Sequence, residues 1–199
     1  MVLNNFERVV VSVLFAYFVY HMLIVTTAKT GLVTVALLVA ESLPVVFTLS
    51  RRKLNAQSDK PGDWLLGLLG ASLPLLVFTD DVSSLISLQT CGAIMLIGIY
   101  VQVSAKIMLG RSFGIVAANR GIKVGGPYRI IRHPMYAGYT ISHIGFLLAF
   151  PSLWNVLLYS TELAVQVTRL LREESLLKQD RDYQDYASRV RYRLIPMIF

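Results

Sequence analysis

Six long apolar segments, separated by short polar ones, constrain this chain more than any other feature of its sequence. They run over residues 7–27, 31–49, 64–79, 85–109, 134–150 and 153–171. A membrane-spanning helix needs about 20 mostly apolar residues, so the pattern predicts an all-α integral membrane protein with about six transmembrane helices. The composition agrees, because only 16% of the residues are charged, whereas soluble domains carry roughly 25%.

The distribution of positive charge predicts how these helices are oriented. If all six segments span the bilayer, the connecting loops alternate between its two sides. One side then holds Arg8, the loops 51–60 and 111–132 and the tail, and the other holds Lys29, Asp80 and Asp81. Loops rich in lysine and arginine face the cytoplasm, so both termini are expected there. The lipid bilayer thus explains the net charge of +7, and no nucleic-acid partner is expected.

The counts of cysteine and histidine argue against a disulfide scaffold and a metal centre. The chain has one cysteine, Cys91, and three widely separated histidines. Zinc sites need closely spaced cysteine and histidine ligands. We therefore expect no metal.

The last apolar segment carries an unusual row of polar side chains. Glu162, Gln166, Arg169 and Glu173 follow the spacing i, i+4, i+7, i+11, which places them on one face of a helix. Charged groups at bilayer depth are costly and usually face a protein interior or a wet cavity. An ion pair near the helix end would explain Arg169 and Glu173. Glu162 lies deeper and favours a functional cavity.

A second polar face is expected on the fifth apolar segment. Tyr136, Thr140 and His143 follow i, i+4, i+7, although a lone histidine within a membrane is more often a packed residue than a ligand. Pro134 suits the first position of a helix, and the residue before proline is kept out of the α region. His133 should therefore lie just before this helix, whose free N–H groups favour carboxylates.

Two polar residues near the end of the fourth segment allow two interpretations. Gln102 and Lys106 have the spacing i, i+4 and could face a cofactor. Lysines near helix ends commonly extend along the helix to place the ammonium at the membrane interface. We expect this second arrangement for Lys106.

Three ordered motifs occupy the C-terminal half of the chain. The first comprises Leu-Gly-Arg-Ser-Phe at 109–113, Gly-Pro-Tyr-Arg at 126–129 and Arg-His-Pro-Met-Tyr-Ala-Gly at 132–138. The second is Arg-Glu-Glu at 172–174, and the third is the tail with Tyr183, Tyr186 and residues 189–196. Together they resemble the isoprenylcysteine carboxyl methyltransferase family, and the phospholipid N-methyltransferases share the Arg-His-Pro-x-Tyr-x-Gly core. Residues 178–182 lack the Phe-Gly of many members, which suggests a subfamily.

The extent of this resemblance divides the chain into two parts. Residues 1–108 are expected to form about four transmembrane helices that match the family only in being apolar. Residues 109–199 are expected to form the methyltransferase core, in which a cytoplasmic loop and an amphipathic tail build the cofactor site.

The resemblance implies that S-adenosyl-L-methionine is the cofactor and that a lipophilic acceptor enters from the bilayer. Glu173 and Glu174 would hold the cofactor's ammonium, and His133 its carboxylate. Gly138 would allow close approach of backbone or ligand. The expected cofactor-binding residues are Tyr128, His133, Pro134, Tyr136, Gly138, Glu173 and Glu174. The residues expected to bind the acceptor are His143, Glu162, Gln166 and Arg169, and the expected catalytic residues are Arg169 and Glu174.

Three functions remain open from the sequence. The favoured one is carboxyl O-methylation of a prenylcysteine-like or other lipophilic carboxylate, which needs only a cation such as Arg169 to orient it. The second is N-methylation of phosphatidylethanolamine, which needs a base such as His133, His143 or Glu162. The third is a small helical transporter or scaffold. The short chain suits a prokaryotic inner membrane, and the endoplasmic reticulum is a further option.

Overall fold

In the described part of this computed structural model, all regular secondary structure is helical. This part covers residues 2–25, 35, 36, 38, 39, 42, 46, 61–79, 83–109 and 122–199. These residues form six α-helices, two short 3-10 helices and no strand. The α-helices are α1 (Val2–Val25), α3 (Pro61–Ser72), α4 (Leu88–Leu109), α5 (Pro134–Ala149), α6 (Leu153–Leu177) and α7 (Arg181–Arg189). The 3-10 helices are η2 (Leu73–Leu76) and η4 (Gly126–Arg129).

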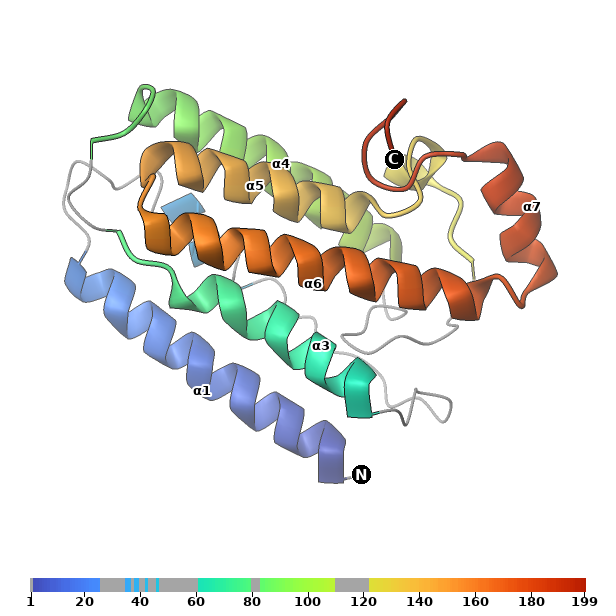
Figure 1. The fold of residues 1–199 in the computed structure, drawn as a ribbon, viewed down its shortest axis with the longest axis horizontal. Helices are drawn as coiled ribbons and strands as arrows, with labels where there is room; N and C mark the ends of the chain where they lie inside the picture. Colours follow the sequence, from blue (N-terminus) through green and yellow to red (C-terminus); the bar gives the residue numbers. More distant parts are fainter. Residues whose placement is uncertain are drawn as a thin grey trace.

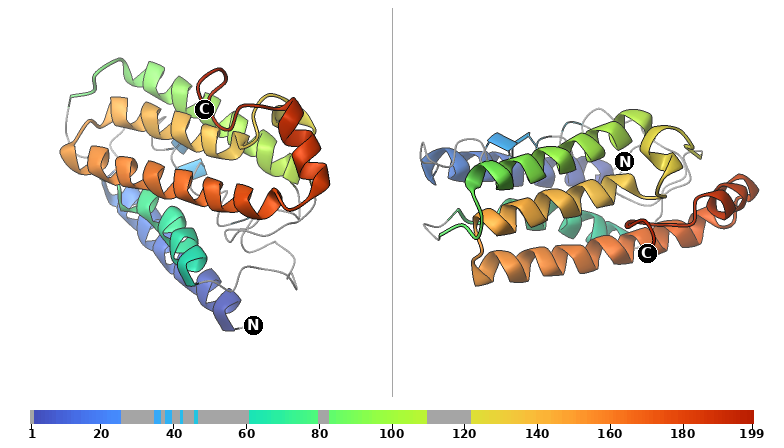
Figure 2. Two further views of the ribbon diagram at one scale, coloured as in Figure 1. Left: turned by 45° about the vertical axis from the view of Figure 1, so that its right-hand side comes forward. Right: turned by 90° about the horizontal axis from the view of Figure 1, so that it is seen from above.

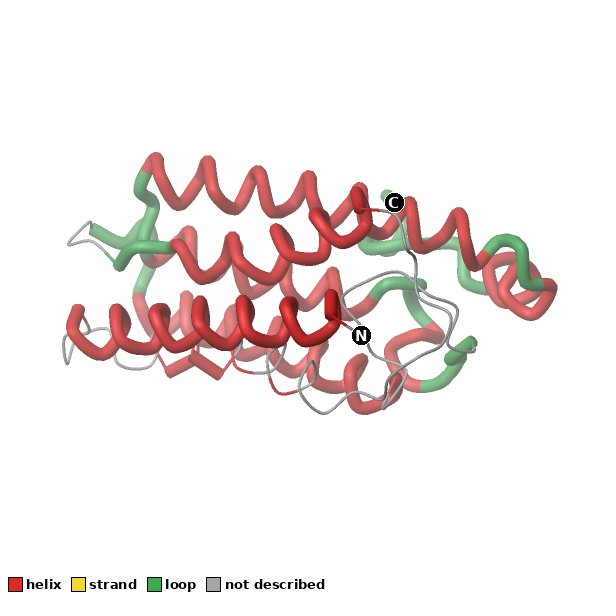
Figure 3. The backbone as a smooth tube through the Cα atoms, turned by 90° about the horizontal axis from the view of Figure 1, so that it is seen from below, coloured by secondary structure: helices red, strands yellow, loops and turns green. Residues whose placement is uncertain are grey.

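The long helices form a bundle in which the successive helices α3, α4, α5 and α6 alternate in direction (Figure 1). α1, α3 and α5 run one way, and α4 and α6 run the other (Figure 1). Two further views keep α4, α5 and α6 side by side, with α7 projecting beyond one end (Figure 2). Seen from below, the described loops gather at the two ends of the bundle (Figure 3). This alternation is the arrangement that successive membrane crossings would require.

The expected transmembrane segments differ from the observed helices mainly in length. Of the described helices, α4 is the one that is long and apolar enough to cross a membrane. The third expected segment is shorter than a span, because its α-helix ends at Ser72 and η2 follows with Pro74 near its start. Proline cannot donate the hydrogen bond that continues an α-helix. Most of the second expected segment, the loop 51–60, Lys29, Asp80, Asp81 and residues 110–121 lie outside the described residues.

Helices α4 and α5 approach each other through small residues. A Cβ added at Gly138 would lie 2.7 Å from the backbone nitrogen of Gln102, and one at Gly98 would lie 2.6 Å from the carbonyl oxygen of Gly138. The Ser142 hydroxyl donates to the carbonyl of Met95 at 3.3 Å. Small residues that let two backbones meet, joined by hydroxyl hydrogen bonds, are typical of helix pairs in membranes.

Apolar side chains form both the interior and much of the outer surface. One buried cluster includes Phe18, Met95, Phe146 and Tyr159, and a second joins α5 and α6 to the tail around Tyr136, Leu170 and Tyr186. Large apolar side chains are also exposed on the outer faces of the helices, among them Val13, Tyr17, Tyr20, Leu96, Ile97, Tyr100, Ile107, Leu153, Leu157 and Leu163. An exposed apolar surface of this extent indicates contact with lipid or protein.

Candidate active site

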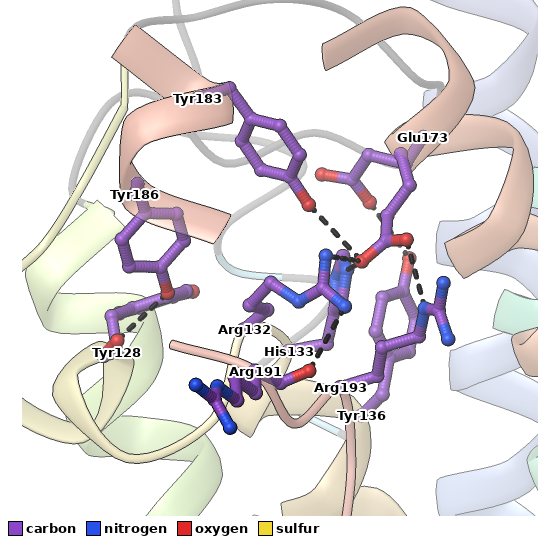
Figure 4. Close-up of polar contacts among 10 residues, drawn as sticks. Tyr128, Arg132, His133, Tyr136, Glu173, Tyr183, Tyr186, Arg191 and Arg193 are labelled. Atoms are coloured by element: carbon purple, nitrogen blue, oxygen red, sulfur yellow. Dashed lines mark hydrogen bonds and ion pairs between the residues drawn. The ribbon is translucent and has the colours of Figure 1, made fainter. Parts of the chain in front are cut away.

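A buried carboxylate, that of Glu174 near the end of α6, joins all three sequence motifs. Figure 4 labels four residues that contact it, Arg132, His133, Tyr183 and Arg193. Oε1 of Glu174 lies 2.9 Å from Nη1 of Arg132 and 3.3 Å from Nε2 of His133. The Tyr183 hydroxyl donates to the same oxygen at 3.1 Å, and Nε of Arg193 donates to Oε2 at 2.9 Å. The first motif, the glutamate pair and the tail therefore meet at one atom group.

The surroundings of Glu174 keep it ionised and leave it little room for another partner. The residue is 1% exposed, and its four described donors match the roughly four lone-pair sites of a carboxylate. Burial by itself raises the pKa of Glu174, but hydrogen bonds from His133 and Arg193 and the charge of Arg132 outweigh burial and lower this pKa to about 2. This geometry favours a positioning role. The predicted catalytic and ammonium-binding roles of Glu174 remain predictions.

The tail lies against the segment that precedes α5. The backbone N–H of Arg132 donates to the carbonyl of Tyr192, and that of His133 donates to the carbonyl of Arg193, both at 2.9 Å. Nη2 of Arg132 also donates to the carbonyl of Arg191 at 3.2 Å. These bonds satisfy backbone groups in a segment without regular structure. They hold the start of α5 and the tail together as one unit.

The start of α5 has the conformation that the sequence predicts. Pro134 occupies the first turn, and His133 precedes it with φ −128° and ψ 59°, outside the α region. The imidazole does not cap the helix. It is 7% exposed and turns toward Glu174. The prediction for the backbone of His133 is confirmed, and its cofactor contact remains a prediction.

Helix α7 presents two tyrosines to this site. Asp180 caps the helix by accepting from the N–H of Asp182, and Tyr183 and Tyr186, three residues apart, both face inward at 3% exposed. The Tyr186 hydroxyl donates to the carbonyl of Tyr128 at 2.8 Å. Burial, with the nearby Glu174 charge, raises the pKa of Tyr183, and burial raises that of Tyr186 to about 12. Both hydroxyls therefore stay protonated and able to donate.

The polar face of α6 continues from Glu174 toward the middle of the bundle. Glu173 accepts a hydrogen bond of 3.4 Å from the hydroxyl of Tyr136. Cζ of Arg169 lies 5.7 Å from the centre of the Tyr136 ring, a cation–π contact. The guanidinium of Arg169 also packs against Gly70 of α3, where a Cβ would lie 2.6 Å from Nη1. The structure thus brings Tyr136, Arg169 and Glu173 together.

Two further residues that were expected to bind the methyl acceptor lie deeper on the same face. Glu162 and Gln166 are 1% and 3% exposed, and Nε2 of Gln166 donates to Oε1 of Glu162 at 2.8 Å. His143 on α5 stacks on Tyr159 with ring centres 4.1 Å apart and on Tyr139 at 6.3 Å. His143 is therefore a packed residue of the α5–α6 contact, and its substrate role remains a prediction.

The structure supplies contacts that the sequence did not specify. Tyr128 is buried, and it is joined to α7 through its carbonyl. Gly138 was expected to allow close approach of either backbone or ligand. It faces the backbone of α4, which supports the first of these. Arg132, Tyr183 and Arg193 were not expected site residues. All three lie within the motifs, but nothing in the sequence pairs them with Glu174.

The prediction that Lys106 extends its ammonium to the membrane interface is wrong. Lys106 is 0% exposed, so its ammonium does not extend to the surface. It donates to Oε1 of Gln102 at 3.1 Å and lies 4.8 Å from the centre of the Tyr139 ring. The close contact of α4 with α5 at Gly138 turns this face of α4 inward, and helical spacing alone does not reveal which face is covered.

Comparison with known proteins identifies the family. The phospholipid methyltransferase family matches residues 84–183, half of the chain. No curated protein matches the chain. The matched region contains α4, the Arg-His-Pro segment, α5, α6 and the first residues of α7, and so includes Glu174 and three of its four partners. The predicted relation to phospholipid methyltransferase-like membrane enzymes is confirmed, and the family implies a methyltransferase associated with membranes. This chain belongs to the phospholipid methyltransferase family.

Proposed function

We propose that this protein transfers a methyl group from S-adenosyl-L-methionine to a lipophilic acceptor at the Glu174 end of the bundle. The observation that carries the proposal is the joining of all three motifs at the buried Glu174 carboxylate. We further propose that six helices span the membrane and that the Glu174 end faces the cytoplasm.

The side chains around Glu174 suit the charged groups of the proposed cofactor. Its amino-acid part carries an ammonium and a carboxylate, and when bound it supplies an electrophilic methyl group on a sulfonium. One carboxylate, Glu174, faces two guanidinium groups, which leaves positive charge to attract the cofactor's carboxylate. Glu173 is partly exposed and bonded to the neutral hydroxyl of Tyr136, so we assign it to the ammonium. Glu174 then positions Arg132, His133 and Arg193.

The bundle supplies the remaining requirements of methyl transfer. An in-line displacement needs alignment of donor and acceptor and exclusion of water. The residues between the Glu174 network and the middle of the bundle are aromatic or apolar, including Tyr136, Met135 and Leu170. An apolar acceptor would approach them from the lipid-facing surface.

For the acceptor we propose a lipophilic carboxylate. A carboxylate is ionised at neutral pH and needs a cation to orient it. Arg169 is such a cation, and it lies over the ring of Tyr136. It would therefore present the acceptor oxygen next to the cofactor site.

Methylation of a phospholipid amine is the second candidate, and two observations favour it. The matching family is that of phospholipid methyltransferases. In addition, the interior holds Glu162 at 1% exposed, a carboxylate that could bind an ammonium or take its proton.

The first test is calorimetric titration of the purified full chain in detergent with S-adenosyl-L-methionine and S-adenosylhomocysteine. We expect saturable binding of both, weakened about tenfold or more by Glu173→Gln, because a charge-assisted hydrogen bond is lost. Lys178→Gln, which removes an exposed charge, is the control and should bind normally. A folded wild-type protein that binds neither compound would make the transporter or scaffold the leading function.

The second test separates the two acceptors by the chemistry of their products. Tritiated methyl groups on a carboxyl ester are released as volatile methanol by mild base, whereas those on a phospholipid amine are not. We expect base-labile product with a farnesylcysteine acceptor. Arg169→Lys should lower kcat more than it weakens cofactor affinity, because lysine cannot form a bidentate pair. Base-stable product formed only with phosphatidylethanolamine would favour the second candidate.

A further inference from the structure

The tail closes into a small loop, residues 193–199, that presents apolar side chains to the outside. The backbone N–H groups of residues 193–195 donate to an oxygen of Phe199 at 2.8, 2.8 and 3.1 Å. Met197 and Ile198 lie at the turn of this tail loop. They are 85% and 79% exposed, the highest values of any large apolar side chain among the described residues. Neighbouring exposed apolar side chains mark a contact with a protein, a ligand or a membrane.

Met197 adopts a backbone conformation that glycine normally occupies. Its φ is 68°, and within the described part of the chain it is the one residue other than glycine with a positive φ. This conformation costs free energy for a residue with a side chain, and such costs occur most often at functional positions. Glycine would form the same turn without an apolar side chain, so the methionine favours a role for that side chain.

The two segments that meet at this place are basic and contain no acidic residue. Residues 122–133 and 190–199 hold five basic side chains, Lys123, Arg129, Arg132, Arg191 and Arg193. Glu174 on α6 pairs with Arg132 and Arg193, and the other three cations are exposed. Exposed cations beside exposed apolar side chains are the combination that binds an anionic lipid surface.

The backbone holds the tail loop at the level where α5 begins. The N–H groups of Arg132 and His133 donate to carbonyls of the tail, directly before α5 begins at Pro134. In the proposed orientation α5 enters the bilayer at this point, so the tail loop lies at the level of the lipid headgroups. Apolar side chains at this level are buried about 5–10 Å into the boundary between headgroups and acyl chains.

We propose that the tail loop is a membrane anchor. Met197 and Ile198 insert into the leaflet, and the exposed cations of the two basic segments contact anionic headgroups. The inference rests on the proposed orientation of the helices and is independent of methyl transfer. Because Arg193 of the same loop donates to Glu174, lipid contact would also hold the tail against the start of α5.

The test places a fluorophore on the tail loop of the full chain in lipid nanodiscs. Met197→Cys is labelled with bimane, and Gln184→Cys, at an exposed position on α7, is the matched control. Cys91 is buried, so the wild-type chain should stay unlabelled. Brominated acyl chains should quench the label at Met197→Cys more strongly than aqueous iodide does, and the order should reverse at Gln184→Cys.

The preference for anionic headgroups is measured with the same label. The nanodiscs contain equal amounts of phosphatidylcholine and phosphatidylglycerol, with bromine on one lipid or on the other. Brominated phosphatidylglycerol should quench the label at Met197→Cys more strongly. Arg191→Gln should lower the relative association constant of phosphatidylglycerol about fivefold, the effect of removing one cation near an anionic surface. Arg181→Gln, which removes an exposed cation of α7, should leave it unchanged.

A second labelled position guards against a local defect in Met197→Cys. Ile198→Cys should give the same result. Iodide quenching at both positions as strong as at Gln184→Cys would overturn the inference. Protection from iodide and from brominated lipid together would assign the tail loop to a contact with a second copy or another protein, and would also overturn it. Equal quenching by the two brominated lipids would overturn anionic lipid as the partner.

Titration of the same samples with S-adenosylhomocysteine separates this inference from the proposed function. A tail loop inserted in lipid, on a chain that never binds S-adenosylhomocysteine, would overturn the proposed function and leave the membrane anchor standing. Normal binding of S-adenosylhomocysteine by a chain whose tail loop is exposed to water would overturn the anchor alone.

Discussion

The two ends of the helix bundle are held together by different chemistry. At one end, Glu174 joins α6 to the start of α5, to α7 and to the tail through two arginines, a histidine and a tyrosine. At the other end, Asn155 joins the start of α6 to neighbouring segments. It donates to the carbonyls of Phe78 and Phe150 at 2.9 and 3.1 Å and accepts from the N–H of Phe78 at 3.1 Å.

This difference supports our proposal that the charged end holds the functional site. The Asn155 end uses a neutral amide bonded to backbone atoms, and Trp154 adds a hydrogen bond to the carbonyl of Leu76. The described groups in these contacts, amides, an indole and backbone atoms, have no protonation states to change. The Glu174 end gathers titratable and cationic side chains, so its stability depends on pH and on charged ligands. We place the functional site at the charged end for this reason.

The largest effect is expected from Glu174→Gln. This change leaves Arg132, whose side chain is 8% exposed, without its carboxylate, and breaking a buried ion pair costs roughly 3–5 kcal/mol. Thermal unfolding in detergent should shift to lower temperature, and limited proteolysis should cut the tail faster. Glu173→Gln is the control, because its partner is a tyrosine hydroxyl at 3.4 Å. Equal stability of both variants would contradict the central role of Glu174.

A smaller effect is expected from Asn155→Ala at the neutral end. Three hydrogen bonds are lost, at roughly 2–3 kcal/mol in total. The same unfolding assay should show a loss that is equal at pH 7 and pH 4, with S-adenosylhomocysteine affinity retained. A loss that changed with pH would mean that the two ends are coupled.

Acid should weaken the charged end selectively. The pKa of Glu174 is lowered from 4.5 to about 2, so its stabilisation is complete above about pH 5 and is lost as the pH falls toward 2. The expected cost at pH 3 is roughly 2 kcal/mol. Stability curves of wild type and Asn155→Ala should fall in parallel between pH 5 and pH 3, whereas the curve of Glu174→Gln should be flatter. Parallel curves for all three proteins would assign the acid sensitivity to other groups.

The smallest effect is expected from Tyr186→Phe. It removes the bond from the Tyr186 hydroxyl to the Tyr128 carbonyl and keeps the packing of the ring, at a cost of roughly 1 kcal/mol. A slightly lower unfolding temperature and faster hydrogen exchange in α7 would confirm it. Exchange that is faster at the Asn155 end instead would contradict the assignment of α7 to the charged end.

Much of the fold could be predicted from local sequence features. The fourth and fifth predicted helices end within three residues of α4 and α5, and the sixth begins where α6 begins, at Leu153. Pro134 and the Pro151-Ser152 turn mark these boundaries by backbone chemistry that acts between neighbours. The polar row of α6 was likewise found by spacing. All four residues of this row are buried or half-buried.

The pairing within the candidate site could not be predicted in the same way. Glu174 and Arg193 are 19 residues apart and Glu174 and Arg132 are 42 apart in the sequence, and no local rule relates them. The motifs indicated that these segments act together, but they did not say that Glu174 would be surrounded by donors. The burial of Lys106 was predicted wrongly for a related reason. It follows from the contact of α4 with α5, which the absence of a side chain at Gly138 allows.

The sequence by itself determined that this chain is helical and apolar, where several helices begin, and that its C-terminal half carries the motifs of membrane methyltransferases. These properties depend on hydrophobic periodicity, proline and residue order, which act over a few turns at most. Only the tertiary structure decided that Glu174 is enclosed by Arg132, His133, Tyr183 and Arg193, and that Gln102 and Lys106 face inward. Those contacts depend on which helix faces meet, and the free energy of that packing is shared among residues far apart in the chain.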